Sequence, residues 1–555
     1  MKKENNKKKR SFHWADINAE KIIREKGEKD IYVCASGITP SGTVHIGNFR
    51  EIISVDLVAR SLREMGRNVR FIYSWDDYDV FRKVPVNMPS QEELKKHLRK
   101  PITSTPDPYG KEESYARHNE KEVEDLLPVV GINPEFIYQS KQYRSSVYAE
   151  EMKTALEKKD SIINILNEHR TTPLPDDWSP VSIFCSKCLK DTTEIKGVDS
   201  GYKVSYHCES CDNKEQVDLR ETSCCKLFWR IDWPMRWKKE GVDFEPAGKD
   251  HHSEGGSFDT AKKIAKEIYS HEPPVTFQYD FISIKGRGGK ISSSSGEVVS
   301  LKDVLDVYQP EIVRYMFAGT RPNSEFSISF DLDVIKIYED YDKCERIFYG
   351  IEQVSEKRLE KEKRIYELSQ VNEVPEYMTK QFGFRHLCNL LQIHNGNIDN
   401  VFEYMELKDI KDFIIPASIK SERLKVELDE KDFEKLLAKV RTRAKCAWNW
   451  ITQFAPENFR FQLRPEDSAH VEITDKEKQV LTALEKEVDN NLDRHNEQSL
   501  SEAIYSISQE LEIQPKDIFK LMYRILIGKE MGPRLAGFML IIGKDRLLKQ
   551  FRPYI

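Results

Sequence analysis

The sequence predicts a protein in two parts, in which an α/β half with a doubly wound parallel sheet precedes an all-α half. In the first half, short β-branched runs at 31–36 and 69–74 alternate with helical patterns at 48–65 and 113–128. Strands that alternate with helices are typical of parallel sheets. After about residue 325 the strand signals nearly vanish and long helical patterns follow. A chain of 555 residues is also too long for one ordinary core.

Further elements complete this pattern. In the first half we expect helices at 143–169 and 256–270, and strands at 226–231, 243–247 and 275–284. In the second half the expected helices span 331–366, 431–454, 473–490, 497–511 and 515–528. The predicted domains are a basic N-terminal extension at 1–30, an α/β domain at 31–325 with an insertion at 180–220, and a helical domain at 326–555.

Composition excludes several classes of protein. No stretch approaches 18 consecutive apolar residues, which argues against a membrane span. The basic N-terminus lacks the apolar segment of a secretory signal. The net charge of −6 means that any surface for nucleic acid must be a local patch. Ten cysteines without such a signal favour reduced thiols, and we expect a cytoplasmic monomer.

The loop after the first expected strand is typical of a phosphate site. It contains Thr39, Pro40, Ser41 and Gly42 and leads into the sequence His45-Ile46-Gly47-Asn48 at a helix start. Free backbone N–H groups and the helix dipole attract anions there. His45 and Asn48 are three residues apart and share one face of the first turn. An ordinary strand–helix turn with an incidental histidine remains the alternative for this motif taken alone.

A second candidate segment is the Gly-, Ser- and cation-rich stretch at 285–296. Its centre contains Lys290, Ile291, Ser292, Ser293 and Ser294. Lys290 would place a point charge on a leaving phosphate group, with serine hydroxyls as further donors. Seen alone, a surface loop explains the composition equally well.

Four cysteines predict a metal site. Cys185-x-x-Cys188 and Cys208-x-x-Cys211 are separated by 19 residues. Two such pairs at this spacing are typical of a four-thiolate, tetrahedral zinc ribbon. Because four thiolates leave no open position, the zinc would be structural, and it would contribute the folding energy of a polar insertion.

Clustered carboxylates indicate a cationic ligand. Asp76, Asp77 and Asp79 follow the second expected strand, and ligands bind at the carboxyl ends of parallel strands. Burial of these carboxylates requires cations, and a substrate with two ammonium groups, such as lysine, would satisfy them. Trp229 or Trp233 would wall a pocket for an aliphatic stem and face its ammonium. A capping or turn cluster is the alternative.

In combination, the HIGN and KISSS motifs, about 245 residues apart, resemble the two signatures of class I aminoacyl-tRNA synthetases. Ser293 stands where the second signature usually has a lysine, and Lys285 or Arg287 are candidates to replace that charge. The segments WDDYD with FRKVP, WRIDWPMRW, EPAGKDHH and QYDFISIKG closely resemble the class I lysyl-tRNA synthetases, over essentially the whole chain.

This resemblance implies a Rossmann-like catalytic domain, a helical anticodon-binding domain, and ATP-dependent attachment of L-lysine to tRNA(Lys) through a lysyl-adenylate. It implies that His45, Asn48 and Lys290 stabilise the transition state. The implied ATP-binding residues are Thr39, Pro40, Ser41, Gly42, His45, Gly47, Asn48, Lys290, Ile291, Ser292, Ser293 and Ser294. For lysine recognition the resemblance implies Gly37, Thr39, Trp229 or Trp233, His252 and Tyr279, and the carboxylate cluster adds Asp76 and Asp77 as candidates. The implied cofactors are ATP, Mg²⁺ and structural Zn²⁺ bound by Cys185, Cys188, Cys208 and Cys211.

Three alternatives remain open at this point. A glutamyl specificity would need an arginine cluster for the side-chain carboxylate, whereas this chain has WDDYD. A cysteinyl specificity would need metal-binding Cys and His side chains, which the neighbourhood of HIGN lacks apart from Cys34. A catalytically inactive tRNA-binding protein would retain the helical half. A small-molecule nucleotidylyltransferase would share the first half of the chain but not the second.

Overall fold

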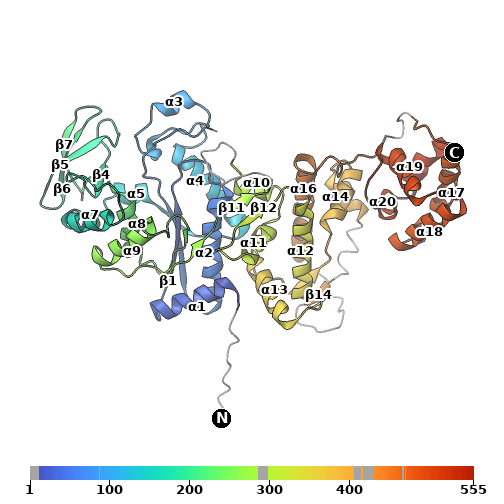
Figure 1. Cartoon of the computed structure of the whole chain (residues 1–555), viewed down its shortest axis with the longest axis horizontal. Helices are drawn as coiled ribbons and strands as arrows, with labels where there is room; N and C mark the ends of the chain where they lie inside the picture. Colours follow the sequence, from blue (N-terminus) through green and yellow to red (C-terminus); the bar gives the residue numbers. More distant parts are fainter. Residues whose placement is uncertain are drawn as a thin grey trace, which may run out of the picture. The chain divides into compact units, whose positions relative to one another are not determined.

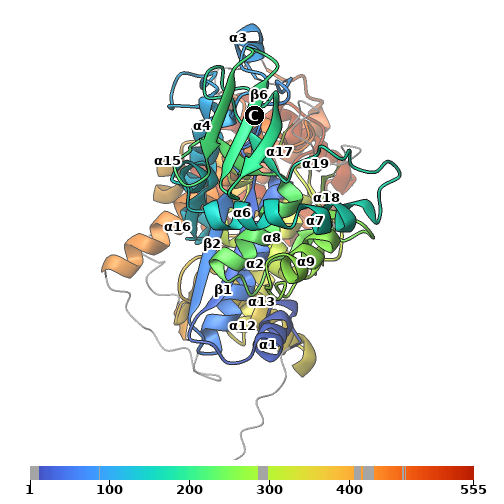
Figure 2. The same ribbon diagram turned by 90° about the vertical axis from the view of Figure 1, so that its left-hand side faces the viewer.

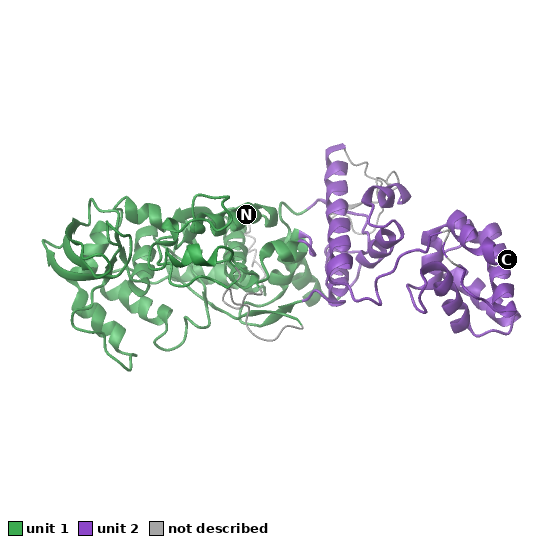
Figure 3. Ribbon diagram, turned by 90° about the horizontal axis from the view of Figure 1, so that it is seen from above, with its two compact units in different colours: residues 1–305, 310–328, 354–374 green, residues 306–309, 329–353, 375–555 purple. Residues whose placement is uncertain are grey.

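The structure is a computed structural model that describes residues 12–86, 88–285, 298–405, 414–416, 430–465, 468 and 470–555. The chain divides into two compact units, shown in different colours in Figure 3. Unit 1 comprises 1–305, 310–328 and 354–374, and unit 2 comprises 306–309, 329–353 and 375–555.

A parallel sheet forms the centre of unit 1. β1 (Tyr32–Ile38; Figure 1) pairs in parallel with β2 (Val69–Trp75), which lies beside it in Figure 2. β2 in turn pairs in parallel with β3 (Glu135–Tyr138). On the other side of β1, single parallel bridges join Cys34 to Phe244 and Phe244 to Val275. The sheet order is therefore β3-β2-β1, continued by the segments at 244 and 275. This arrangement confirms the predicted parallel α/β fold.

Helices cover both faces of this sheet. α2 (Ile46–Glu64) packs on β1 and β2, and α1 (Trp14–Lys26) packs on α2. On the opposite face, side chains of β1, β2 and β3 form one buried cluster with α8 (Trp229–Glu240) and α9 (Ser257–Glu267). Cover on both faces is the doubly wound arrangement, and it places the loops after the strands at one edge of the sheet.

The other elements of unit 1 lie around this sheet. The helices are α3 (Gln91–Lys95), α4 (Tyr115–Leu126), α5 (Gln139–Arg144), α6 (Ala149–Glu157), α7 (Lys159–Asn167), α10 (Leu301–Leu305), α11 (Pro310–Gly319) and α13 (Glu356–Ser369). Short 3₁₀ turns are η1 (Ile102–Ser104) and η2 (Pro128–Val130). Two parallel pairs join β9 (Ala247–Gly248) to β10 (Gln278–Tyr279) and β11 (Ile282–Ile284) to β12 (Phe326–Ile328).

The insertion between the halves of the sheet is a small antiparallel structure. β4 (Val181–Ile183) pairs with β8 (Cys225–Leu227), and between them β5 (Thr193–Asp199), β6 (Lys203–Cys208) and β7 (Lys214–Asp218) form a three-stranded sheet. Its buried side chains join those of α6 and α7 in one apolar cluster.

Unit 2 is mainly helical. Its helices are α12 (Asp333–Phe348), α14 (Phe384–Ile393), α15 (Ile398–Tyr404), α16 (Glu430–Gln453), α17 (Asp475–Asn491), α18 (Glu497–Glu510), α19 (Pro515–Ile527), α20 (Leu535–Ile542) and α21 (Lys544–Phe551), with the turns η4 (Leu492–Arg494) and η5 (Arg552–Tyr554). One short pair joins β13 (Tyr377–Thr379) and β14 (Ile414–Pro416). Within the described residues, no helix is long and apolar enough to cross a membrane.

Several elements differ from the sequence expectation. The strand expected at 226–231 ends at Leu227, and the helix α8 begins at Trp229. Every residue from Ile231 to Trp237 is buried, so no polar face marks the helical period in the sequence. The helix expected at 331–366 is two helices, and α1 lies within the expected N-terminal extension.

Candidate functional site

A cavity of about 440 Å³ opens at the carboxyl ends of β1 and β2. It is lined by the end of β1 and the residue after it (36–39), by Asp76 and 78–80 after β2, by Asn48 and Glu51 of α2, by Trp229 and Asp232 of α8, and by His251 and Tyr279. We call it the acidic cavity, because five carboxylates line it: Glu51, Asp76, Asp79, Asp191 and Asp232. Its position is the usual ligand site of parallel α/β sheets.

Glu51 is held by neutral donors. Its Oε1 accepts hydrogen bonds from the Ser36 hydroxyl at 2.8 Å and the Gly37 N–H at 3.1 Å, and its Oε2 accepts one from the Tyr279 hydroxyl at 2.5 Å. Burial raises the pKa of Glu51, and these hydrogen bonds offset part of the rise. The carboxylate is therefore fixed in place without a neutralising charge.

The other carboxylates of the acidic cavity are paired with cations. Arg236 pairs with both Asp76 and Asp232, the latter at 3.1 Å. Lys226 Nζ lies 3.2 Å from Asp79, and Arg99 lies 2.8 Å from Asp191. Across the described parts of the chain, Glu51 is the lining carboxylate that has no ion pair. A ligand ammonium would balance its charge, because a buried carboxylate is stable only when it is paired or protonated.

The structure separates the two aspartates expected at the substrate. Asp76 lines the acidic cavity, whereas Asp77 does not. Asp77 accepts hydrogen bonds from the backbone N–H (2.7 Å) and the hydroxyl of Ser140 at the start of α5. Burial raises the pKa of Asp77 to about 6 despite these bonds. Asp77 therefore holds α5 against the end of β2.

The structure also separates the two tryptophans. Trp229 lines the acidic cavity and is 40% exposed. Trp233 is 6% exposed, belongs to the buried cluster under the sheet, and donates its indole N–H to Glu245 at 3.0 Å. The indole rings stack with centroids 5.0 Å apart, so Trp233 supports Trp229 from below.

Of the remaining residues expected at the amino acid, three line the acidic cavity and one does not. Gly37, Thr39 and Tyr279 line the acidic cavity. His252 does not; its ring stacks on Phe258 at 4.7 Å, and its neighbour His251 lines the cavity in its place. Sequence reasoning missed Glu51, Asp232 and His251. A lone carboxylate inside the apolar start of α2 was the available signal for Glu51.

The HIGN segment forms the beginning of α2 beside a second cavity. This cavity, the loop cavity, has a volume of about 430 Å³ and is lined by Thr43–His45, Asn48 and 300–303, among others. The His45 N–H donates to Asn48 Oδ1 at 3.2 Å. Asn48 lines both the loop cavity and the acidic cavity. A Cβ on Gly47 would lie 2.9 Å from the His45 ring, so any larger residue at this position would displace that ring.

Other residues expected at a nucleotide lie in two places. Pro40, Ser41 and Gly42 belong to the loop between β1 and α2 and line neither cavity. Lys290, Ile291, Ser292, Ser293 and Ser294 lie outside the described residues. The chain that follows them passes beside the start of α2, where the Ile46 N–H donates to the Val299 carbonyl at 2.8 Å.

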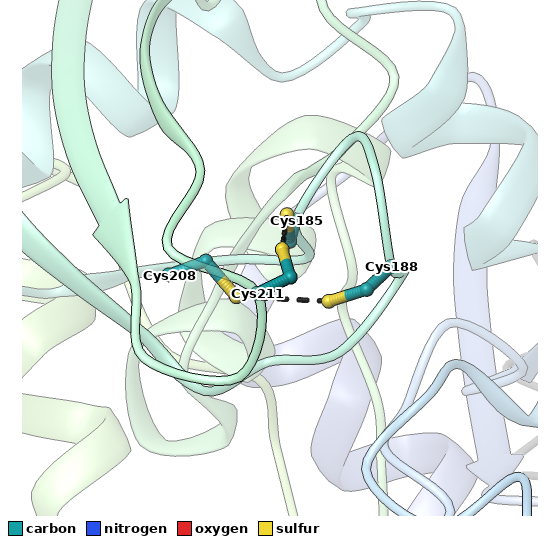
Figure 4. A group of neighbouring side chains, drawn as sticks. All are labelled: Cys185, Cys188, Cys208 and Cys211. Atoms are coloured by element: carbon teal, nitrogen blue, oxygen red, sulfur yellow. Dashed lines mark hydrogen bonds between the residues drawn. The ribbon is translucent and has the colours of Figure 1, made fainter.

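The four expected metal ligands lie together in the insertion. Figure 4 shows the thiols of Cys185, Cys188, Cys208 and Cys211 directed toward one another, and all four sulfurs lie within 4.8 Å of each other. The Cys185–Cys211 and Cys188–Cys208 sulfur distances are 3.5 and 3.6 Å. A zinc tetrahedron with Zn–S bonds of about 2.3 Å has sulfurs about 3.8 Å apart. The donor set and its size therefore fit zinc.

Two family models match the chain. One, described as class I tRNA synthetases (K), matches residues 12–372, and the other, described as an anticodon binding domain, matches residues 407–555.

Several curated relatives are similar over nearly their full length, and three of them are each described as a lysine–tRNA ligase. The chain is 56% identical to the protein of Borreliella burgdorferi, over 98% of this chain and 100% of the relative. It is 51% identical to that of Treponema pallidum, over 98% and 99%. It is 40% identical to that of Pyrococcus horikoshii, over 97% and 99%.

Proposed function

The chain belongs to the family of class I tRNA synthetases for lysine, and we propose that its acidic cavity selects L-lysine for ATP-dependent attachment to tRNA(Lys). The observation that carries this proposal is Glu51. It is the cavity carboxylate with neutral hydrogen-bond donors and, within the described residues, no ion pair.

Lysine differs from most amino acids by its second ammonium group. Every amino acid carries an α-ammonium, so selection of lysine requires a partner for the ε-ammonium. Glu51 supplies that charge, and the Tyr279 hydroxyl orients the carboxylate. The exposed ring of Trp229 offers a wall for the aliphatic stem and a face for a cation. Asp76 lies in the same cavity but is already paired with Arg236.

The reaction requires placement and charge stabilisation more than a protein nucleophile. In the first step the lysine carboxylate attacks the α-phosphorus of ATP, and pyrophosphate leaves. In the second step a hydroxyl of the tRNA's terminal ribose attacks the carbonyl of the lysyl-adenylate, and AMP leaves. Asn48 lines both cavities, so it is positioned to contact both reactants of the first step.

His45, Asn48 and Lys290 are the groups proposed to stabilise the charge that develops on the phosphates. The backbone N–H groups at the start of α2 add to this attraction for anions. Magnesium, when bound to ATP, neutralises phosphate charge. Val299 accepts a hydrogen bond from Ile46 at the start of α2. Lys290 precedes Val299 by only nine residues, and an extended chain spans about 3.3 Å per residue, so Lys290 can reach the start of α2.

We assign the four-thiolate cluster to a structural zinc. Four thiolates fill the tetrahedron, so the ion has no position for a substrate. The last four residues of β5, between the two cysteine pairs, and the first three of β7, just after them, are exposed, so the metal would help to hold the insertion together.

The match of an anticodon model to 407–555 supports a role of the helical half in binding tRNA(Lys). No disulfide joins any of the ten cysteines, all of which lie in the described part of the chain, and this fits a reducing cytoplasm. A monomer stays a prediction that light scattering would test.

Aminoacylation of total tRNA with each labelled amino acid tests the function. We expect ATP-dependent charging with lysine alone. Charging with another amino acid would retain the chemistry but overturn the role of Glu51. Binding of tRNA without any charging would favour a tRNA-binding protein without catalysis.

A further inference from the structure

A third cavity, distinct from the loop cavity, lies beside the acidic cavity. It has a volume of about 350 Å³ and lies between the first turn of α8 (228–231) and the segment 166–178 that follows α7. We call it the aromatic groove, because Trp178, Phe228 and Trp229 form much of its wall. None of the residues placed at the phosphates or the zinc belongs to it.

The rings of this groove are unusually exposed. Phe228 is 43% exposed and Trp229 is 40% exposed, and Trp178 stacks on Phe228 with centroids 6.0 Å apart and an interplanar angle of 26°. Exposed aromatic rings at a concave surface are typical of a binding site. Two nearly parallel rings present flat apolar faces, which suit another planar ring.

Cations without acidic partners border these rings. Arg230 donates to the carbonyl of Gly255 and the hydroxyl of Thr260, both at 3.1 Å, and Arg170 donates to the carbonyl of Thr172 at 3.0 Å. Among the described residues, neither guanidinium has a carboxylate within ion-pair distance. Both arginines line the groove, so it combines aromatic faces with uncompensated positive charge. This combination suits single-stranded nucleic acid, whose bases stack and whose phosphates are negative.

The groove adjoins the acidic cavity. Phe228 and Trp229 line both hollows, so they form the wall between them. A single-stranded nucleic acid that lies in the groove would thus have its end next to the cavity that holds the amino acid.

We propose that the aromatic groove binds the unpaired nucleotides at the 3′ end of tRNA, with Phe228 and Trp178 stacking on a base and Arg170 and Arg230 contacting phosphates. This proposal rests on the proposed function, because the terminal ribose must reach the lysyl-adenylate. A double helix would not suit the groove, since paired bases do not expose their faces to a side chain.

A thermodynamic cycle between protein and RNA tests the groove in the absence of lysine and ATP. Affinity is measured for wild type and Phe228→Leu, each with intact tRNA(Lys) and with the same tRNA lacking its three unpaired 3′ nucleotides. We expect Phe228→Leu to weaken binding of intact tRNA about tenfold, the effect of losing one stacked base. Binding of the truncated tRNA should change less than twofold.

Two variants serve as controls. Phe228→Tyr keeps the ring and should bind intact tRNA as wild type does. Tyr505→Leu removes an aromatic ring of similar exposure from α18, and it should affect intact and truncated tRNA equally. Arg230→Gln should reduce the slope of log affinity against log salt concentration for intact tRNA by about 0.7, as expected for one lost single-strand phosphate contact.

If Phe228→Leu lost affinity equally for both RNAs, or for neither of them, the groove proposal would be overturned. Lysine charging by the wild-type enzyme is a separate readout. If charging occurs while Phe228→Leu binds both RNAs as wild type does, only the groove assignment is wrong. If no lysine is charged but Phe228→Leu weakens binding of intact tRNA alone, the proposed function is wrong and the assignment of the groove to RNA is retained.

Discussion

The hydroxyl of Tyr279 donates a 2.5 Å hydrogen bond to Oε2 of Glu51, although the two residues are 228 positions apart. Through this bond β10, which contains Tyr279, fixes the carboxylate of Glu51 on α2. The groups that hold the carboxylate are neutral, so in its ionised form no described cation of the protein balances its charge. The next two predictions test whether this charge selects the substrate.

Replacing Glu51 by Gln should raise KM for lysine in tRNA charging by about 10- to 100-fold, because a hydrogen bond between charged groups contributes about 1.5–3 kcal/mol. The amide keeps the shape and one acceptor but removes the charge. Glu254→Gln is the matched control, because Glu254 is an exposed carboxylate outside the acidic cavity. A KM for lysine that stays within twofold of wild type would assign the ε-ammonium to another residue.

The affinity for lysine should depend on pH through Glu51. Burial raises the pKa of Glu51 above the ordinary glutamate value of about 4.3. As pH falls through the raised value, the carboxyl group takes up a proton and loses its attraction for an ammonium, so KM for lysine should rise. The pH profile of lysine KM checks this, and Glu51→Gln should abolish the acidic limb.

The same shift has a consequence for stability with a definite sign. Because the folded protein binds this proton more tightly than the unfolded chain, the contribution of Glu51 to stability decreases as pH rises from the unfolded pKa through the folded one. Glu51→Gln should therefore be more stable than wild type at neutral pH. Thermal unfolding of wild type and Glu51→Gln at an acidic and a neutral pH measures this. A stability difference between the two proteins that is the same at both pH values would contradict it.

Trp229 and Trp233 should behave differently when each is replaced by Ala. Trp233→Ala should destabilise the protein by about 3–5 kcal/mol, because it empties a buried site and removes a donor from Glu245. Trp229→Ala should mainly raise KM for lysine, because its exposed ring lines the acidic cavity. Denaturant unfolding and charging kinetics separate the two effects. The opposite pattern would exchange the roles of the two residues.

These two tryptophans illustrate what the sequence could predict. The motifs around them place both near a ligand, but only the three-dimensional structure shows that α8 turns one ring to the cavity and the other to the core. Periodicity failed here, since α8 is buried on all sides over seven residues. The predicted strand at 226–231 therefore runs past the true end of β8 at Leu227 and into the first turn of α8.

The carboxylate at the centre of the proposed site shows a different limit. Strand–loop–helix order predicts where Gly37 and Thr39 lie, because the carboxyl ends of parallel strands meet at one edge. The role of Glu51 depends on which distant groups surround it, and spacing along the chain carries no such information. The cysteine cluster was accessible to prediction, because its spacing alone indicates the geometry.

Purified enzyme should contain one zinc ion per chain, bound by Cys185, Cys188, Cys208 and Cys211. Cys188→Ser should lower the zinc content and destabilise the insertion, because the metal supplies folding energy. Cys224→Ser is the control, since this thiol lies near the insertion but outside the cluster. Metal analysis and limited proteolysis measure both effects. A full zinc content in Cys188→Ser would remove this cysteine from the ligand set.

Gly47→Ala tests the positioning of His45 without removing any functional group. An alanine Cβ would lie 2.9 Å from the His45 ring, so the ring must move away from its present place at the start of α2. Because His45 is proposed to stabilise charge on the phosphates, we expect kcat for charging to fall about 10- to 100-fold, comparable to the loss of one oriented donor. KM for lysine should change little, since neither Gly47 nor His45 lines the acidic cavity.

The matched control for this variant is Gly319→Ala at the end of α11, where an added Cβ would have its nearest neighbour at 4.0 Å. Circular dichroism and thermal unfolding of both variants establish that α2 still forms. Wild-type kcat in a folded Gly47→Ala enzyme would mean that the ring position is unimportant for the chemical step. A rise in lysine KM with unchanged kcat would instead place His45 in amino-acid binding, because uniform loss of ground-state and transition-state binding leaves kcat intact.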